Sequence, residues 1–297
     1  MHLCLGCVAL GGYDYGALDE KTCLDTVYAA LDNNITHFDT ANIYGLGRSE
    51  EILGLALQNR NEIIITTKFG VCWDHNQKTT YKDISSKGIR CALEGSLKRL
   101  KRDTIDQYLI HWHDGKTNLS EVVETLDKLK DEGKIKAYGC SNFKEEHMSP
   151  FVNKFSIIQM PYNMIQKETE PILRFCAKNN YETMAYNILE RGLLTGKYDL
   201  RTVKFLGTDT RQHSFFFDKN KERFFKTGLD TLRLLAKDKK VTMANLAIAY
   251  VTHKSFISCL VVGAKSREQV LENTKALQIR LTKEECLLLD NAFNNTF

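Results

Sequence analysis

Four residues of different chemistry stand at or just after the ends of three apolar stretches of the chain. Asp39, Lys68 and His111 end such stretches, and Tyr44 follows Asp39 by five residues. If these stretches are parallel strands closed into a barrel, their C-terminal ends meet at one rim. We therefore expect an acid, a phenol, an amine and an imidazole to converge there.

This set of groups suits the reduction of a carbonyl, whose oxygen needs a proton as it gains charge. A free tyrosine has a pKa near 10, which is high for a proton donor at neutral pH. A nearby Lys68 ammonium would favour the phenolate of Tyr44 and lower that pKa. Asp39 would hold Lys68 in place, and His111 would hydrogen-bond the substrate oxygen, a contribution of about 3–4 kcal/mol for a well-placed donor.

Each of these residues by itself also fits a structural role. Asp39 fits a helix N-cap, Tyr44 a packing residue of a loop, and His111 a hydrogen-bonded core histidine. Lys68 is harder to explain in this way, because a buried amine needs a partner. The combination at successive strand ends favours a catalytic unit.

A competing pattern is a metal site built from His111, His113 and Asp114. The two histidines would share one face of an extended strand, and metal-dependent barrel hydrolases use such pairs. We find no second cluster of histidines or carboxylates after a later strand. The set is therefore short of ligands, and we expect no metal site.

The segments that must position these groups alternate between strand and helix patterns. Apolar residues recur at three- or four-residue spacing in Glu20–Asn33, Ser49–Leu57 and Leu119–Asp131, and a final helix is expected at Lys283–Phe293. Eight short apolar stretches suit buried parallel strands: Leu3–Val8, Ile35–Asp39, Ile63–Lys68, Ile105–His111, Lys134–Cys140, Phe155–Met160, Tyr181–Tyr186 and Ile257–Val262. Eight such units predict an α/β fold, a closed (β/α)8 TIM barrel that forms a single domain over residues 1–297.

An open, doubly wound sheet is the alternative, but no GxGxxG motif follows any of the strands. The segment Asp199–Asn220 lacks clean periodicity. In a barrel it would be a long loop after the seventh strand, where binding loops belong. We expect Val71–Asp83, His113–Asn118 and this loop to shape the substrate pocket.

Composition places the chain in the ordinary globular class, with 43% hydrophobic residues, 26% charged residues and a net charge of +4. The densest basic stretch, residues 98–102, has the spacing of a solvated helix end rather than of a nucleic-acid patch. No stretch approaches the roughly 18 apolar residues of a membrane span, and the first residues lack a signal-peptide pattern. We expect a monomer or homo-oligomer with a small-molecule carbonyl substrate and no nucleic-acid or membrane partner.

The nine cysteines are scattered singly through the chain. This distribution is typical of reduced thiols in a cytoplasmic protein rather than of a disulfide scaffold. Cys4 and Cys7 form a CxxC pattern within an expected strand, where alternating side chains would place them on opposite faces. A redox or metal role for this pair is therefore not expected.

The motifs of the chain resemble those of the aldo-keto reductase superfamily, a (β/α)8 family that binds NADP without a Rossmann fold. The resemblance extends from about residue 3 to residue 277 and rests on Phe38-Asp39-Thr40-Ala41 with Tyr44-Gly45, on Thr67-Lys68, and on Ile110-His111-Trp112. It implies an NADPH-dependent oxidoreductase that reduces an aldehyde, ketone or keto-sugar. Tyr44 would be the general acid, Lys68 and Asp39 would tune it, and His111 would orient the carbonyl.

The resemblance also implies a cofactor site along the later strand ends. Ser141, Asn142 and Gln159 would hold the nicotinamide carboxamide, and Tyr186 would stack on its ring. The following loop would contact the diphosphate through backbone groups, and Arg211 would reach the phosphates. The residues implied for this part of the site are Cys7, Val8, Ser141, Asn142, Gln159, Tyr186, Asn187, Ile188, Leu189, Glu190, Arg191, Lys197 and Arg211.

The stretch from Val262 to Asn273 resembles the family's adenosine-binding segment. Gly263 lets the backbone approach a phosphate, and the start of the following helix favours an anion. Lys265, with Arg267 nearby, would neutralise a 2′-phosphate, which favours NADPH over NADH. Residues Gln269, Glu272 and Asn273 would read the adenine.

Two departures from the family pattern concern the pocket. The usual Ser-Pro-Leu is replaced by Asn187-Ile188-Leu189, which removes one hydroxyl contact to the diphosphate. The proline that often follows His-Trp is replaced by His113, which we expect to line the substrate pocket beside Trp112. The main alternative function is a nucleotide-sensing regulatory subunit with slow turnover, similar to the β subunits of potassium channels. That group has Asn at the position of His111, so His111 favours a working enzyme.

Overall fold

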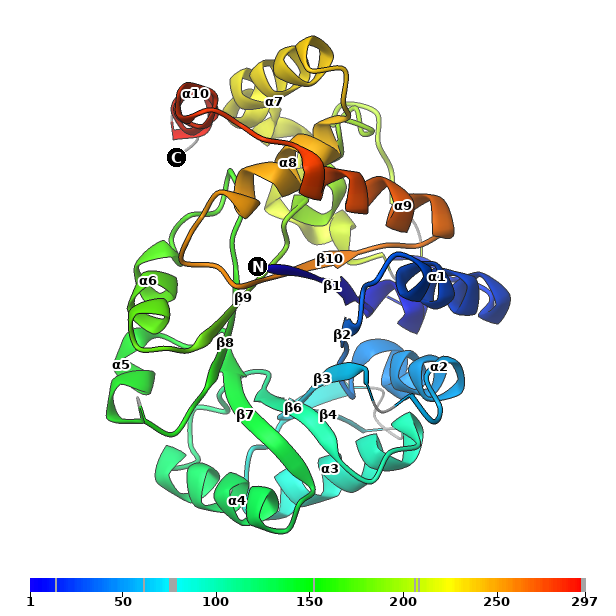
Figure 1. Ribbon diagram of the computed structural model, residues 1–297, viewed down its shortest axis with the longest axis vertical. Helices are drawn as coiled ribbons and strands as arrows, with labels where there is room; N and C mark the ends of the chain where they lie inside the picture. The colour runs from blue at the N-terminus through cyan, green and yellow to red at the C-terminus, as the bar shows by residue number, and fades with distance from the viewer. Residues whose placement is uncertain are drawn as a thin grey trace.

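The computed structural model describes residues 1–294 except 14, 61, 75–78, 152, 206 and 208. Eight parallel strands close into a barrel in the order β1-β10-β9-β8-β7-β6-β3-β2, and helices surround it (Figure 1). The strands are β1 (His2–Gly6), β2 (His37–Asp39), β3 (Ile64–Phe69), β6 (Ile105–Ile110), β7 (Ile135–Ser141), β8 (Ile157–Pro161), β9 (Glu182–Tyr186) and β10 (Cys259–Gly263). The predicted barrel is confirmed, and the bounds of each strand lie within two residues of those predicted.

Several helices begin at a side chain that accepts a hydrogen bond from a free backbone amide. Asp19 accepts from the amide of Thr22 at 2.7 Å, and Asn118 and Ser266 cap their helices in the same way. These residues cap α1, α4 and α9. The helices are α1 (Glu20–Asp32), α2 (Arg48–Ala56), α3 (Ser86–Leu100), α4 (Leu119–Asp131), α5 (Glu145–Met148), α6 (Glu170–Lys178), α7 (Glu222–Asp238), α8 (Met243–Thr252), α9 (Arg267–Lys275) and α10 (Lys283–Asn294).

The interior of the barrel is apolar in the middle and polar at both ends. The middle is a buried cluster of Cys4, Leu109, Ile157, Met184, Cys259 and Val261. Alternate residues of a strand face the same side, so the residues two positions before and after these also face inward. The strands therefore carry polar groups to the two ends of the interior.

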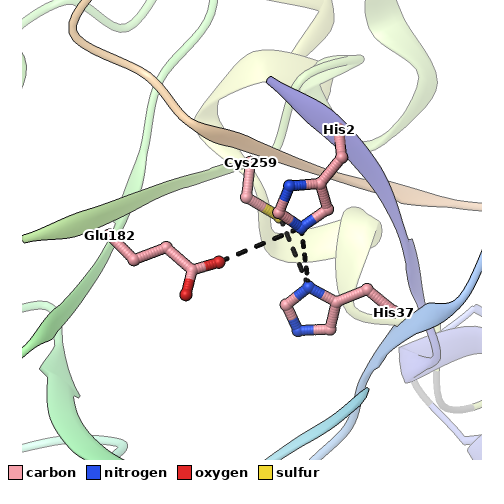
Figure 2. A group of neighbouring side chains, drawn as sticks. All are labelled: His2, His37, Glu182 and Cys259. Carbon is pink, nitrogen blue, oxygen red and sulfur yellow. Dashed lines mark hydrogen bonds and ion pairs between the residues drawn. The ribbon is translucent and has the colours of Figure 1, made fainter. Parts of the chain in front are cut away.

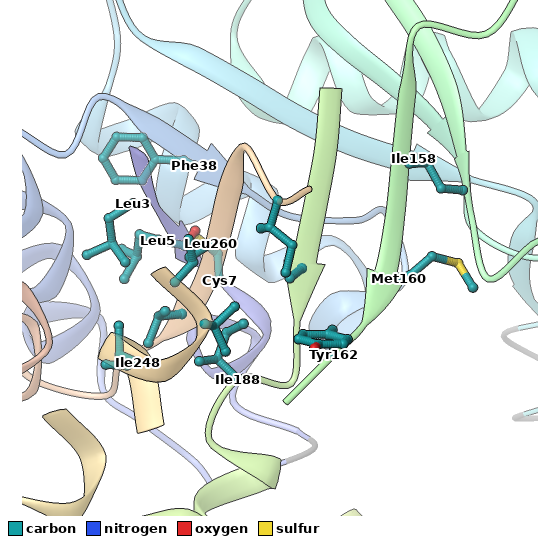
Figure 3. Close-up of a cluster of buried hydrophobic side chains, with 14 of the residues drawn as sticks. Leu3, Leu5, Cys7, Phe38, Ile158, Met160, Tyr162, Ile188, Ile248 and Leu260 are labelled. Carbon is teal, nitrogen blue, oxygen red and sulfur yellow. The ribbon is translucent and has the colours of Figure 1, made fainter. Parts of the chain in front are cut away.

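Cys4 and Cys7 lie in different clusters, as predicted from strand alternation. Cys4 belongs to the interior cluster, whereas Cys7 packs with Leu3 and Leu5 in the larger cluster between strands and helices. Figure 3 shows part of this outer cluster, in which Phe38 also lies. All nine cysteines are free thiols.

Two of the segments expected to be pocket loops contain regular structure. Within Val71–Asp83, strands β4 (Val71–Asp74) and β5 (Thr79–Lys82) form an antiparallel hairpin, whose connecting residues 75–78 lie outside the described part of the chain. The long segment after β9 contains three short 3-10 turns, Thr210–His213, Phe215–Phe217 and Lys219–Lys221. Among the described helices, none has the length and apolar character needed to cross a membrane.

Candidate active site

A cavity of about 420 Å³ lies at the C-terminal ends of the barrel strands. This is the end at which (β/α)8 enzymes carry their active sites. Most of the residues singled out in the sequence line this cavity: Val8, Asp39, Tyr44, His111, Trp112, Ser141, Asn142, Gln159, Tyr186, Asn187, Ile188, Leu189, Arg191, Lys197, Arg211, Gly263, Lys265, Gln269, Glu272 and Asn273. The barrel thus brings together groups that are spread over more than 260 positions of the chain.

Lys68 does not line the cavity but lies directly behind its wall. Its side chain is 1% exposed, and its Nζ atom donates to both carboxylate oxygens of Asp39 at 2.8 and 2.9 Å and to the carbonyl of Thr40 at 2.8 Å. The same Nζ atom lies 3.5 Å from the hydroxyl of Tyr44. The buried ammonium is therefore held by a carboxylate on one side and faces the phenol on the other.

Tyr44 is positioned by a close contact between two glycine backbones. Gly45 has a φ of +60°, and a Cβ atom at this position would lie 2.2 Å from the carbonyl oxygen of Gly11. Only glycine accepts both this backbone conformation and this approach. The loop that carries Tyr44 is therefore pressed against the turn that follows β1.

His111 lies edge-on to Tyr44, with ring centroids 5.7 Å apart and an interplanar angle of 84°. Burial, together with the charge of Lys68, lowers the pKa of His111 to about 3, so the imidazole is neutral at physiological pH. Its Nδ1 atom is buried and has no hydrogen-bond partner in the described part of the chain. A bare lone pair is tolerated better there than an unpaired N–H, which leaves the proton on Nε2 as a donor for a ligand.

Asn142 and Tyr186 are joined to His111 by hydrogen bonds. The hydroxyl of Tyr186 donates to Asn142 Oδ1 at 2.7 Å, and the amide nitrogen of Asn142 donates to the carbonyl of His111 at 3.1 Å and to Ser141 Oγ at 3.1 Å. Burial raises the pKa of Tyr186 well above its ordinary value, so this residue stays a neutral donor. Asn142 thus links three strand ends.

Gln159 contacts the catalytic candidates directly. Its amide nitrogen donates to Asp39 Oδ2 at 2.6 Å. The side chain is 2% exposed, and its amide oxygen is left to accept a hydrogen bond from a ligand. The sequence suggested only a cofactor contact for Gln159, whereas the structure also makes it a partner of the Asp39 carboxylate.

Three further predicted residues lie away from the cavity wall. Cys7 is fully buried in the outer core. Glu190 is also fully buried and accepts a hydrogen bond from Asn163 at 2.8 Å; burial raises its pKa to about 7. His113 stacks on His147, with ring centroids 5.6 Å apart, and accepts from the amide of Gly115. These contacts turn His113 toward α5 instead of toward the substrate pocket, which departs from our expectation.

The loop after β9 has an unusual backbone. Asn187, Glu190 and Arg191 have φ values of 60°, 43° and 52°, and Gly192 has 100°. Left-handed conformations at non-glycine residues are uncommon and cluster at ligand sites. Such bends turn successive peptide groups toward one side, as in backbone cradles for anions.

The far end of the cavity is positively charged. Lys197, Arg211 and Lys265 line it, and burial together with the charge of Arg211 lowers the pKa of Lys265. Arg211 is paired with Asp209, so the charges of Lys197 and Lys265 leave this part of the site net positive, which suits an anionic ligand. Gln269, whose side chain accepts from the amide of Lys265 at 2.9 Å, lies at the start of the adjoining helix α9.

Taken with the polar groups near Tyr44, this charge pattern fits a nicotinamide dinucleotide. Ser141 and Gln159 offer a hydroxyl and an amide oxygen where a carboxamide would lie, and the cationic end would take the phosphates. Arg211 is prepared for this by three fixed partners. Its guanidinium pairs with Asp209, donates to the hydroxyl of Tyr198 at 2.6 Å, and lies 4.3 Å from the ring centre of Phe205.

Sequence reasoning missed some of the cavity wall, including Tyr15 and Tyr198. Tyr15 follows β1 in a stretch without periodicity, so no pattern indicated its place. Tyr198 directly follows Lys197, and its position becomes apparent only when Arg211 folds back onto it. Within the described residues, His111, His113 and Asp114 do not belong to any group whose ligand atoms converge on a metal position.

Comparison with known proteins gives consistent matches over almost the whole chain. The profile of the Aldo/keto reductase family matches residues 2–293. The chain is 35% identical to Aldo-keto reductase YhdN of Bacillus subtilis (98% of this chain, 89% of the relative) and 32% identical to the NADH-specific methylglyoxal reductase of Escherichia coli (96% and 92%). Among solved structures it is similar to the glycerol dehydrogenase AKR11B4 from Gluconobacter oxydans, with a TM-score of 0.89, 34% identity, and coverage of 99% of this chain and 91% of that one.

Proposed function

The chain belongs to the aldo/keto reductase family, and on that premise we propose that it reduces an aldehyde, ketone or keto-sugar to the alcohol with NADPH. As a member of the family it is an oxidoreductase that acts on carbonyl or CH–OH groups. The observation that carries the proposal is the ion pair between Lys68 and Asp39, placed 3.5 Å from the hydroxyl of Tyr44 at the wall of the cavity.

Tyr44 would donate the proton that the substrate oxygen needs as the carbonyl is reduced. Donation leaves a phenolate, whose negative charge is stabilised by the adjacent Lys68 ammonium. Lys68 stays charged because the buried carboxylate of Asp39 holds it; breaking such a pair by removing one partner costs about 3–5 kcal/mol. A proton from solvent then restores the phenol.

His111 would hold the substrate oxygen in reach of Tyr44. Its low pKa keeps the ring neutral, so it can donate a hydrogen bond from Nε2 without adding a positive charge beside Lys68. A donor aimed at the oxygen as charge develops accelerates the reaction more than one that binds the ground state equally well.

A nicotinamide cofactor would supply the hydride when bound. Ser141 and Gln159 would orient its carboxamide, Tyr186 would set the face of the ring, and the loop from Asn187 to Gly192 would hold the diphosphate. Lys265 and Arg211 support the preference for NADPH, because a 2′-phosphate adds negative charge where these cations lie. The E. coli relative is NADH-specific by name, so this preference needs its own measurement.

The nine free cysteines support our proposal that the enzyme works in the cytoplasm, where thiols stay reduced. Its substrate there would be a small carbonyl compound. The cavity that Tyr44 and His111 line would also have to hold a dinucleotide, which leaves little room for the substrate.

The test is a panel of aldehydes, ketones and keto-sugars, followed by the loss of NADPH absorbance, with wild type and Tyr44→Phe. We expect Tyr44→Phe to lower kcat by about 10²–10⁴, the range for general acid catalysis, while NADPH binding measured by fluorescence is retained. Tyr28→Phe, at an exposed position of α1, is the matched control. Near-normal turnover by Tyr44→Phe would refute the assignment.

A further inference from the structure

Four side chains that can bind a metal ion meet at the end of the barrel opposite the cavity. His2, His37, Glu182 and Cys259 are the first residues of β1, β2, β9 and β10. Their ligand atoms all lie within 4.8 Å of one another, and the side chains point toward a common centre (Figure 2). The proposed reduction uses none of these residues.

The distances between the ligand atoms are close to those of a tetrahedral site. His2 Nε2 lies 2.9 Å from His37 Nδ1 and 3.9 Å from Glu182 Oε1, and Cys259 Sγ lies 3.9 Å from His37 Nδ1. Zinc bonds of about 2.0–2.1 Å to nitrogen or oxygen and about 2.3 Å to sulfur require ligand atoms about 3.3–3.6 Å apart. Shifts of about 0.5 Å would bring these three distances to those of the metal site, and the remaining ligand atoms already lie within 4.8 Å of one another.

Hydrogen bonding already selects the tautomer of His37 that a metal requires. Its Nε2 atom lies 2.7 Å from Thr66 Oγ1, and this hydroxyl donates its own proton to Gln107 Oε1 at 2.6 Å. Thr66 must then accept the hydrogen of His37 Nε2. The Nδ1 atom of His37 is left with a lone pair that faces the other three ligands.

The carboxylate of Glu182 is oriented by the same chain of hydrogen bonds. Gln107 Nε2 donates to Glu182 Oε2 at 2.6 Å, which leaves Oε1 facing His2. Metal-binding histidines and carboxylates are commonly fixed in this way by outer hydrogen bonds. Thr66 and Gln107 thus support two of the four ligands from β3 and β6.

We propose that His2, His37, Glu182 and Cys259 form a structural zinc site that closes the bottom of the barrel. One thiolate, two imidazoles and one carboxylate are a ligand set that zinc accepts, and four protein ligands are typical of a structural site rather than a catalytic one. Binding would release the thiol proton of Cys259 to solvent, and the hydrogen on His2 Nε2 would move to His2 Nδ1, so that both imidazoles bind as neutral ligands.

The ion would bridge four adjacent strands, β2, β1, β10 and β9, and two of the three seams between them have few backbone pairs. β1 pairs with β2 only through Leu5 with Phe38 and Gly6 with Asp39, at the far end of the strand from His2. β9 and β10 likewise share two residue pairs. β1 and β10 pair along five residues, from His2 with Cys259 to Gly6 with Gly263, so the metal would add most at the two other seams.

The experiment uses the full chain purified with a tag that contains no histidine and dialysed against a chelator. Zinc is then added, excess is removed, and bound metal is measured by mass spectrometry. We expect one zinc per chain and a rise in Tm of about 5–10 °C at saturation. Replacing zinc with Co²⁺ should produce the thiolate-to-cobalt charge-transfer band together with the visible bands of tetrahedral cobalt.

Variants assign the ligands. Cys259→Ser should abolish the charge-transfer band. His2→Gln should weaken zinc binding at least 100-fold. Because the His2 side chain is 47% exposed, this second variant is expected to fold and tests the site even if Cys259→Ser does not fold. Thr66→Val should keep the band but weaken binding about 10–100-fold. Cys91→Ser, at an exposed cysteine of α3, should behave as wild type. Substoichiometric zinc without a Tm shift, or wild-type binding by His2→Gln, would overturn the proposal.

Discussion

Gln159 Nε2 donates a hydrogen bond of 2.6 Å to Asp39 Oδ2, which joins β8 to β2 across the upper end of the barrel interior. Asp39 thereby receives this bond in addition to the two from Lys68. The carboxylate is held from both sides, so its orientation toward Lys68 is fixed. A residue implied as a cofactor contact thus also supports the proposed proton donor.

Replacing Gln159 with Met should remove this support at nearly constant volume. A hydrogen bond to a charged group contributes about 1.5–3 kcal/mol, so we expect a loss of that size in the free energy of unfolding, measured with urea. We also expect kcat to fall. Gln58→Met, at an exposed position after α2, is the control; equal stability of the two variants would show that the Asp39 contact contributes nothing.

Gly45→Ala should displace Tyr44, because its Cβ would lie 2.2 Å from the Gly11 carbonyl oxygen. Misplacing a catalytic group by about 1 Å can cost 10²-fold in rate, so kcat should fall by about that factor. Gly16→Ala separates the two causes of strain: Gly16 also has a positive φ, but its Cβ would meet no atom within 4 Å. If both variants lose the same activity, the contact with Gly11 does not position Tyr44.

Lys265→Ala should weaken NADPH binding more than NADH binding, because only NADPH carries the 2′-phosphate. Cofactor fluorescence gives the dissociation constants of NADPH and NADH, and we expect the ratio of the two constants to change at least tenfold. The exposed Lys283→Ala on α10 controls for the loss of one positive charge. Equal losses for both cofactors would place the 2′-phosphate away from Lys265.

His111 should make the protein less stable as the pH falls below 6.5. In the unfolded chain a histidine takes up a proton near pH 6.5, whereas in the folded chain this group stays neutral down to about pH 3. The folded state therefore loses up to about 1.4 kcal/mol relative to the unfolded state between pH 7.5 and 5.5. Urea unfolding of His111→Asn should lack this loss. His213→Asn, at an exposed histidine, is measured alongside; a wild-type pH dependence in His111→Asn would contradict the expectation.

The barrel was predictable because its strands and helices differ strongly in hydrophobic period. Leu119–Asp131 was predicted with the bounds that α4 has, since apolar residues recur regularly between an Asn cap and charged positions. The hairpin of β4 and β5 was not predicted. Its strands pair with each other and with no barrel strand, and the residues of β5 are exposed, so they carry no apolar alternation.

The gathering of the candidate site residues at one cavity was predictable because residues that follow the ends of barrel strands meet at one rim, a rule that can be applied to a sequence. No such rule predicts the cluster of His2, His37, Glu182 and Cys259 at the opposite end of the barrel. His2 and Cys259 are 257 positions apart, and they become neighbours only through the register of β1 against β10. His113 shows where position in the chain misleads. Its place beside Trp112 suggested a pocket residue, but stacking on His147 decides where its ring lies.

The apolar middle layer of the barrel interior would separate proton transfer at Tyr44 from proton release at Cys259. Cys4, Leu109, Ile157, Met184 and Val261 form a largely apolar layer that packs with Cys259 on one side and separates His37 from the ion pair of Lys68 on the other. In the proposed reaction, a proton lost from Tyr44 would be replaced from the side of the cavity, and a proton released from Cys259 by the proposed zinc binding would leave at the opposite end of the barrel. The same eight strands therefore carry the cavity at one end and the proposed zinc site at the other, and no proton needs to pass between the two.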